Sequence, residues 1–175
     1  MPAIRNIYLI GPMGSGKTAV GRQLARQLHL KFHDSDVEIE RRTGVDIPYI
    51  FEKEGEAGFR EREREVIDLL TQLDSVVIAT GGGAILLPEN RARLAERGHV
   101  IYLRTGIEQQ LERTRHGRQR PLLYTDNPEA RLRELMAQRA PLYESIAKLT
   151  VPTDGRAVRV VADEIVQLLK EPVAS

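Results

Sequence analysis

The sequence predicts an α/β domain of three layers, in which helices cover both faces of a five-stranded parallel sheet. Amphipathic helical patterns separate five short apolar runs, and this alternation is typical of buried parallel strands. The length of 175 residues suits one such domain. The predicted strands are Ile7–Ile10, His29–Phe32, Val76–Ala79, Val100–Leu103 and Lys148–Val151.

The first apolar run leads directly into a glycine-rich motif, Gly11–Thr18, that matches G-x-x-x-x-G-K-[ST]. The following residues predict a helix from Thr18 to Leu28 with its apolar side chains on one face. Glycines let the backbone fold around an anion, and the helix N-terminus adds partial positive charge. Lys17 can reach the β- and γ-phosphates of a nucleotide, and the Thr18 hydroxyl can coordinate Mg²⁺. A chance match in a glycine-rich turn is the alternative, but both flanking elements favour a nucleoside triphosphate site.

Two aspartates, Asp34 and Asp36, follow the second apolar run. Carboxylates at the C-terminal ends of parallel strands face the ligand crevice of an α/β sheet. If the chain stays extended there, these two side chains point the same way. The alternative is an acidic loop that caps the next helix. The sequence leaves both interpretations open.

A run of alternating charges between Gly55 and Glu65 is typical of a salt-bridged surface helix. Its i,i+4 neighbours are like-charged, as for Arg60 and Arg64, and only i,i+3 pairs such as Arg60 and Glu63 are opposite. An arginine held by a glutamate can present its planar fork to a ligand carboxylate. Arg60 is therefore a candidate for carboxylate binding.

Three consecutive glycines, Gly81–Gly83, follow the third predicted strand. They make sense where the backbone approaches a ligand or exposes its N–H groups, and a tight turn into a helix near Pro88 is the alternative. No carboxylate ends this strand, and the chain has no Asn-Lys-x-Asp guanine motif. The missing carboxylate disfavours both switch GTPases and motor ATPases, and the missing guanine motif further disfavours switch GTPases.

The segment of about 113–127 is rich in Arg, Gly and Pro and lacks periodicity, which predicts a mobile loop. A guanidinium supplied by a closing lid stabilises the charge that spreads over a transferring phosphoryl group. Arg120, stiffened by Pro121, is the expected lid residue. Arg115 and Arg118 are expected only to contribute to a basic surface loop. The last predicted helix spans about Val158–Lys170.

Together these motifs resemble the shikimate kinase family in order and spacing over nearly the whole chain. The resemblance implies a P-loop nucleoside-monophosphate-kinase-like fold in one domain, 1–175, with a substrate-binding helical region of about 34–62 and a mobile lid. It implies phosphorylation of shikimate at its 3-hydroxyl by ATP, in aromatic amino-acid (chorismate) biosynthesis. The matching elements are the P-loop, Asp34-x-Asp36, Gly55-Glu56, Phe59-Arg60, Gly81-Gly82-Gly83, Arg120-Pro121-Leu122-Leu123 and Gln138-Arg139-x-x-x-Tyr143.

The resemblance also implies a role for each matching position. Asp36 would bind the shikimate hydroxyls and accept the proton of the 3-hydroxyl, and Lys17 and Arg120 would join it in catalysis. Thr18, and Asp34 through water, would hold Mg²⁺. The substrate carboxylate would bind Arg60, oriented by Glu63, and Arg139, while the bound ring would meet Gly81, Gly82 and Gly83 beside an apolar wall of Ile47, Phe51 and Phe59. ATP would contact Gly14, Ser15, Gly16, Lys17, Thr18, Ala19, Arg113, Arg120 and Arg156.

Composition limits the remaining possibilities. Lys plus Arg number 26 and Asp plus Glu 25, so no overall field attracts nucleic acid or a membrane. The chain has no cysteine, no signal-peptide pattern and no transmembrane stretch, and we expect a cytoplasmic monomer. Two alternatives stay open: a P-loop kinase for another hydroxylated carboxylate such as gluconate, and a non-catalytic nucleotide-binding switch.

Overall fold

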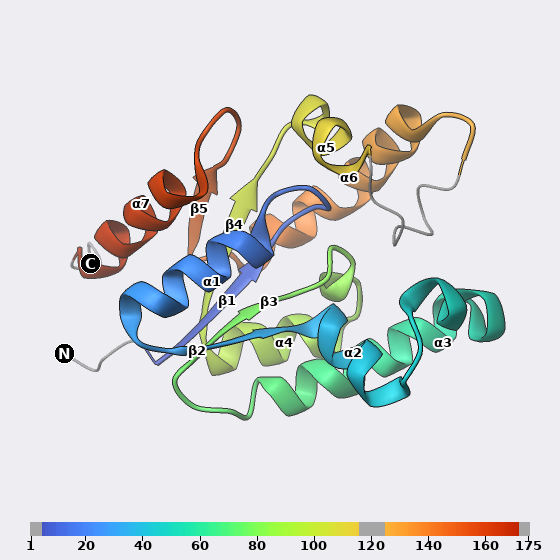
Figure 1. Ribbon diagram of the computed structural model, residues 1–175, viewed down its shortest axis with the longest axis horizontal. Coiled ribbons are helices and arrows are strands. Elements are labelled where there is room, and N and C mark those ends of the chain that lie inside the picture. Colours follow the sequence, from blue (N-terminus) through green and yellow to red (C-terminus); the bar gives the residue numbers. More distant parts are fainter. Residues whose placement is uncertain (1–4, 116–124, 172–175) are drawn as a thin grey trace.

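The computed structural model describes residues 5–115 and 125–171, and within them the chain forms a five-stranded parallel sheet of order β2-β3-β1-β4-β5. This architecture confirms the predicted fold class. The order places β1 at the centre, with β3 on one side and β4 on the other (Figure 1). The strands are β1 Asn6–Ile10, β2 Lys31–Asp34, β3 Val76–Ala79, β4 His99–Arg104 and β5 Leu149–Pro152.

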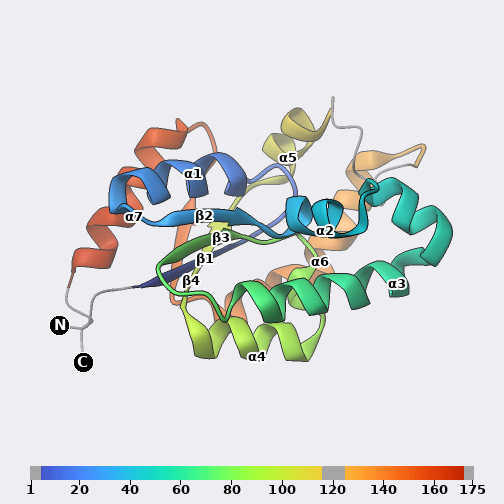
Figure 2. The same ribbon diagram turned by 60° about the horizontal axis from the view of Figure 1, so that its bottom comes forward.

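Helices cover both faces of the sheet (Figures 1 and 2). α1 and α7 pack side by side on one face, and α3, α4 and α6 cover the other. Within the described residues, no helix combines the length and apolar character needed to cross a membrane. The helices are α1 Lys17–Leu28, α2 Ser35–Thr43, α3 Ile47–Leu70, α4 Pro88–Arg97, α5 Ile107–Thr114, α6 Pro128–Ile146 and α7 Val158–Lys170, with a 3₁₀ turn at Ala84–Leu86.

The sheet divides the interior into two apolar cores. Successive strand residues point to opposite faces. In β1, Ile7 and Leu9 pack with α1 and α7, whereas Tyr8 and Ile10 pack with the helices of the other face. Because both faces are covered, the strands are apolar at almost every position, which is why they were visible as short continuous runs.

The second strand differs from its prediction. It spans Lys31–Asp34, two residues later than the expected His29–Phe32. α1 continues to Leu28, and His29 ends it in the left-handed conformation, at a φ of 56°. A residue that ends a helix in this way cannot also begin a strand, so β2 starts after the turn. The shift places Asp34 as the last residue of β2.

Gly98, between α4 and β4, has no room for a side chain. A Cβ atom there would lie 2.5–2.9 Å from the ring of Tyr8, which is fully buried and donates its hydroxyl to the carbonyls of Arg97 and Thr71. We expect Gly98→Ala to lower the free energy of unfolding by about 1–3 kcal/mol, since a buried ring cannot move aside without strain. Urea unfolding measures this change.

Gly106→Ala is the matched control, because a Cβ at Gly106 would meet its nearest neighbour, a side-chain oxygen of Asp154, at an ordinary 3.4 Å. Equal midpoints for the two variants would contradict the packing argument at Gly98.

Candidate active site

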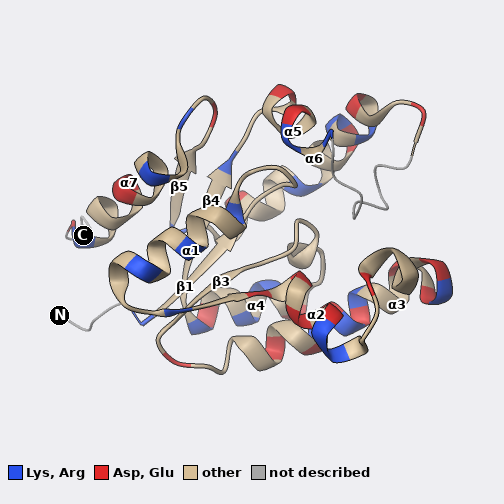
Figure 3. Cartoon of the chain, in the orientation of Figure 1, with Lys and Arg blue, Asp and Glu red and all other residues tan. Residues whose placement is uncertain are grey.

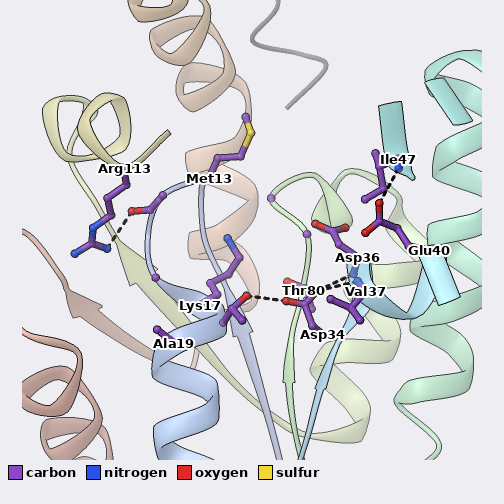
Figure 4. Close-up of a pocket in the computed structure, with 15 residues that line it drawn as sticks. Met13, Lys17, Ala19, Asp34, Asp36, Val37, Glu40, Ile47, Thr80 and Arg113 are labelled. Carbon is purple, nitrogen blue, oxygen red and sulfur yellow. Dashed lines mark hydrogen bonds between the residues drawn. The ribbon is translucent and has the colours of Figure 1, made fainter. Parts of the chain in front are cut away.

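A cavity of about 430 Å³ opens where the C-terminal ends of β1, β2 and β3 meet. The P-loop, residues 11–18, lies on one side with Lys17 (Figure 4). Asp36, Val37 and Glu40 of α2 lie on the other side, and the glycine turn after β3 closes the cavity between them. The cavity therefore has a cationic wall that faces an acidic one.

The P-loop is held in a conformation that suits anion binding. Gly16 adopts the left-handed conformation at the N-cap of α1, with φ at 87°, so the first N–H groups of the helix stay exposed at the loop. Lys17 folds back into the loop, where its ammonium group donates to the carbonyls of Gly11 at 2.6 Å and Pro12 at 2.8 Å. Ala19 follows on the cavity side of α1.

Asp34 links the P-loop to α2. Its Oδ2 atom accepts a hydrogen bond from the Thr18 hydroxyl at 2.7 Å, and its Oδ1 atom accepts from the backbone N–H groups of Asp36 and Val37. Asp34 therefore caps α2 and also reaches the nucleotide motif, so the two interpretations of its position are both correct. Caps of this kind are typical of Asp.

The chain does not stay extended from Asp34 to Asp36, so the condition under which both side chains would point the same way is not met. α2 begins at Ser35, so Asp36 lies in the first helical turn and its side chain points in a different direction from that of Asp34. Asp34 is directed to Thr18, whereas the Asp36 carboxylate lies against Gly81. The two acids thus serve different parts of the cavity.

Two residues of the glycine turn, Gly81 and Gly83, make room for particular side chains. A Cβ at Gly81 would lie 2.7 Å from Asp36 Oδ1 and 2.9 Å from Glu63 Oε2, and its N–H donates to the buried Ser35 hydroxyl at 3.0 Å. Gly82 lies beside a guanidinium nitrogen of Arg139 and the backbone nitrogen of Met13. A Cβ at Gly83 would overlap the guanidinium of Arg60, whose central carbon would lie 2.6 Å away. Two acids, Asp36 and Glu63, and two arginines, Arg60 and Arg139, therefore lie beside the turn.

Arg60 is held by a buried partner. Its Nη1 atom donates to Glu63 Oε1 at 2.9 Å, and the Glu63 side chain is only 1% exposed. Burial raises the pKa of Glu63, while the neighbouring Arg60 and Arg139 oppose that shift. Arg60 also pairs with Glu56 at 3.4 Å, so the expectation that only i,i+3 neighbours here are opposite in charge is wrong.

Arg139 reaches the same turn from α6, and 97% of its surface is buried. Burial lowers the pKa of this guanidinium. Tyr143, one turn later, donates its hydroxyl to the carbonyl of Gly82 and stacks on Tyr102 with ring centroids 5.0 Å apart. Burial raises the pKa of the Tyr143 hydroxyl, which keeps it a donor. Tyr143 appeared in the sequence only as part of a motif, and its spacing from Arg139 was the available signal.

Glu40 is a cavity residue that the sequence did not indicate. It lies one helical turn after Asp36, and its Oε2 atom accepts a hydrogen bond at 3.0 Å from the backbone nitrogen of Ile47, the first residue of α3 (Figure 4). This contact ties α2 to α3. An acid in a charged helix carries no distinctive sequence signal, so only the fold identifies it.

The remaining predicted nucleotide residues are dispersed. Arg113 lies in the last turn of α5 and donates to the carbonyl of Gly14 at 3.0 Å, beside the P-loop. Arg156, in the loop after β5, donates to the carbonyl of Pro152, pairs with Glu164, and does not line the cavity. Arg120 and most of the expected lid lie outside the described residues.

The glycine turn provides a further test. In Gly83→Ala the new methyl group would displace the Arg60 guanidinium, the flexible end of a long side chain. We expect the unfolding midpoint to fall, because moving the guanidinium weakens its ion pair with the buried Glu63, and the Michaelis constant for a carboxylate substrate to rise about tenfold or more, as expected when an ionic hydrogen bond is lost. Thermal unfolding and steady-state kinetics measure the two effects, and an unchanged Michaelis constant would contradict the overlap.

A P-loop at this edge of a parallel sheet, facing acids across one cavity and joined by a glycine turn that adjoins two arginines, is the arrangement of a small-molecule kinase of the P-loop class. The family model for shikimate kinase matches residues 13–170. Curated shikimate kinases from Vibrio parahaemolyticus and Thioalkalivibrio sulfidiphilus are 54% and 58% identical to this chain, covering 95% and 94% of it and 97% and 87% of their own lengths. The chain belongs to the shikimate kinase family.

Solved structures agree with this assignment. A shikimate kinase from Acinetobacter baumannii in complex with shikimate superimposes with a TM-score of 0.94 at 53% identity, covering 95% of this chain and 93% of that one. A gluconokinase from Sinorhizobium meliloti 1021 covers 94% of this chain and 90% of its own, but with a TM-score of 0.59 and 16% identity. The second likeness shows a shared fold alone.

Proposed function

We propose that this protein transfers the γ-phosphoryl group of ATP to the 3-hydroxyl of shikimate, releasing ADP and shikimate 3-phosphate. The observation that supports this most is the glycine turn, whose three consecutive residues adjoin Asp36, Arg139 and Arg60. Two guanidinium groups suit a carboxylate, and a neighbouring carboxylate suits the hydroxyl groups of the same small acceptor.

In this proposal Arg60 and Arg139 bind the acceptor carboxylate through their planar forks. Glu63 keeps Arg60 in place by its 2.9 Å ion pair. The acceptor would bridge from this clamp toward Asp36, which accepts the proton as the hydroxyl oxygen attacks phosphorus. Backbone N–H groups of Gly82 and Gly83 would add contacts to the ring, whereas the Gly81 N–H donates to Ser35 and is not available for this expected contact.

The nucleotide would bind on the opposite wall. Backbone N–H groups of the P-loop would hold the phosphates, and Lys17 would leave the loop carbonyls to meet the β- and γ-phosphates. Arg113, already against the loop at Gly14, and Arg156 would contact the nucleotide, and Arg120 would arrive with the lid. The phosphates and the acceptor then share one cavity, as direct transfer requires.

The residues around Thr18 fit a magnesium ion. Thr18 and Asp34 place a hydroxyl and a carboxylate oxygen 2.7 Å apart beside the P-loop, and Mg²⁺ prefers such oxygen donors together with water and phosphate oxygens. We propose that Thr18 coordinates the ion directly and Asp34 through water. The ion, when bound, neutralises charge that develops on the phosphates.

The decisive experiment is coupled ADP release with MgATP and shikimate, gluconate or AMP as acceptor. Release with shikimate alone, giving a product one phosphate heavier, supports the proposal. Release with gluconate would support the rival kinase, and release without any acceptor would support a nucleotide switch. We also propose that the protein acts as a monomer in the cytoplasm. Sedimentation equilibrium, which measures the mass of the protein in solution, tests whether it is a monomer.

Arg60→Lys tests the carboxylate clamp. An ammonium group cannot reproduce the bidentate fork, so we expect the Michaelis constant for shikimate to rise about tenfold or more while that for MgATP stays unchanged. Arg41→Lys, an exposed arginine on α2 that pairs with Glu38, is the matched control. An unchanged constant for shikimate would remove Arg60 from the clamp.

A further inference from the structure

α3 is not one continuous helix. Gly55 interrupts it with φ at 72° and ψ at −178°, a conformation that only glycine adopts readily. The first segment, residues 47–54, therefore turns away from the second, residues 56–70, near the outer end of the molecule (Figures 1 and 2). We call this break the Gly55 elbow.

Close packing surrounds the Gly55 elbow. Phe51 and Phe59, one from each segment, lie with ring centroids 4.9 Å apart. Gly58 in the second segment has no room for a Cβ atom, because the Glu54 side chain of the first segment occupies that space. This packing favours the closed arrangement of the two segments.

An ion pair joins the two segments across the elbow. Arg62 Nε donates to both carboxylate oxygens of Glu54, at 3.0 and 2.9 Å, and Arg62 Nη2 lies 2.8 Å from Glu54 Oε2. The hydrogen bond from Arg62 lowers the pKa of Glu54, so the pair is ionised at neutral pH. These residues are eight apart, and a straight helix would separate them by about 12 Å along its axis. The pair exists only while the elbow is closed.

Charges of both signs alternate along α3 (Figure 3), but most of its other ion pairs lie within one segment. Arg64 and Glu61, for example, pair at i,i+3 within residues 56–70 and do not cross the elbow. Among the ion pairs of the described residues, Glu54–Arg62 is the one that spans the Gly55 elbow.

The elbow determines the surroundings of Arg60. Glu56, the residue directly after Gly55, pairs with Arg60 at 3.4 Å. Phe59, which the first segment holds through Phe51, lies beneath the Arg60 guanidinium at 5.2 Å from its ring centroid. Opening the elbow would take Phe51 away from Phe59 and so loosen the ring that lies beneath the Arg60 guanidinium.

We propose that the Glu54–Arg62 pair positions Arg60 by keeping the Gly55 elbow closed before the acceptor arrives. This inference rests on the proposed function, in which Arg60 binds the carboxylate of shikimate. If the acceptor binds only the closed form, its apparent affinity is its intrinsic affinity multiplied by the fraction of molecules in which the elbow is closed. Loss of the pair therefore weakens acceptor binding, while the bound complex, once closed, reacts at the normal rate.

The test uses Arg62→Gln and Glu54→Gln, which remove the charge and keep a long polar side chain. We expect the Michaelis constant for shikimate to rise about two- to fivefold in each, the range open to a partly exposed ion pair. The turnover number and the constant for MgATP stay unchanged. The double variant Glu54→Arg/Arg62→Glu restores most of the affinity for shikimate, because it rebuilds the ion pair with its charges reversed.

Arg64→Gln is the matched control, since it removes an ion pair of the same helix that does not cross the elbow. Equal effects in Arg64→Gln and Arg62→Gln would overturn the proposal, as would an unchanged Michaelis constant in Arg62→Gln or a double variant that does not restore the affinity. If the parent protein does not phosphorylate shikimate, the proposed function itself fails. Normal activity in the parent with no effect in the variants refutes the elbow mechanism alone.

Added salt gives an independent readout. Screening weakens an exposed ion pair, so raising the ionic strength increases the Michaelis constant for shikimate in the parent protein. Arg62→Gln lacks the pair and responds less, whereas Arg64→Gln responds as the parent does. Identical salt responses in all three proteins would contradict the proposal.

Discussion

Asp36→Asn is expected to lower the turnover number at least about a hundredfold and to leave MgATP binding intact. Asparagine keeps the shape of the side chain that lies against Gly81 but cannot accept the proton of the attacking hydroxyl. The P-loop and its Lys17 contacts lie across the cavity and are not altered. Steady-state kinetics with shikimate and nucleotide titration by fluorescence or calorimetry measure the two quantities.

The matched control is Asp163→Asn on α7, where Asp163 accepts a hydrogen bond from Gln27 of α1 and lies outside the cavity. Its turnover should equal that of the parent protein. Near-normal turnover in Asp36→Asn would exclude Asp36 as the base, and the electrostatic stabilisation of the phosphates would then carry catalysis alone.

Lys17→Met is expected to abolish measurable phosphoryl transfer, a loss of about a thousandfold or more. Methionine has a similar length but no charge, so charge that develops on the γ-phosphate in the transition state is no longer neutralised at this position. The substitution also removes the hydrogen bonds to the carbonyls of Gly11 and Pro12, so the unfolding midpoint must be measured beside the activity.

Lys170→Met at the end of α7 provides the control for the loss of one positive charge. A Lys17→Met protein that folds normally and still turns over MgATP at the normal rate would contradict the assignment of the P-loop itself. Loss of activity together with a large fall in the unfolding midpoint would point to the loop structure instead of the phosphates.

The parts of the site that depend on short stretches of sequence could be predicted. The P-loop needs only eight consecutive residues, and its glycines, Lys17 and Thr18 occupy the positions that its motif requires. The i,i+3 pair of Arg60 and Glu63 is confirmed for the same reason, since both residues lie on one helix. Apolar strands that are buried on both faces were also visible, and β3 spans the predicted residues Val76–Ala79.

Features that depend on distant parts of the chain could not be predicted. Glu63 resembles any acid of a charged surface helix, yet the glycine turn and Arg139 bury it. The direction of Asp36 depends on where α2 begins, and its start at Ser35 places Asp36 in the first helical turn. The Gly55 elbow has no distinct local signal, because an isolated glycine in a helical pattern is compatible with an unbroken helix.

The glycine turn divides the acceptor pocket into positions that can vary and positions that cannot. Gly81 and Gly83 adjoin the side chains of Asp36 and Arg60 so closely that a mutant library at these two sites would recover mainly inactive clones, whereas a Cβ at Gly82 would meet its neighbours at an ordinary 3.5–3.6 Å. Ile47 lines the cavity and packs in the apolar core around α3, whereas Phe51 packs on Phe59 across the Gly55 elbow. Directed evolution toward a bulkier hydroxylated acid should therefore randomise Ile47 and keep Gly81, Gly83 and Phe51 constant.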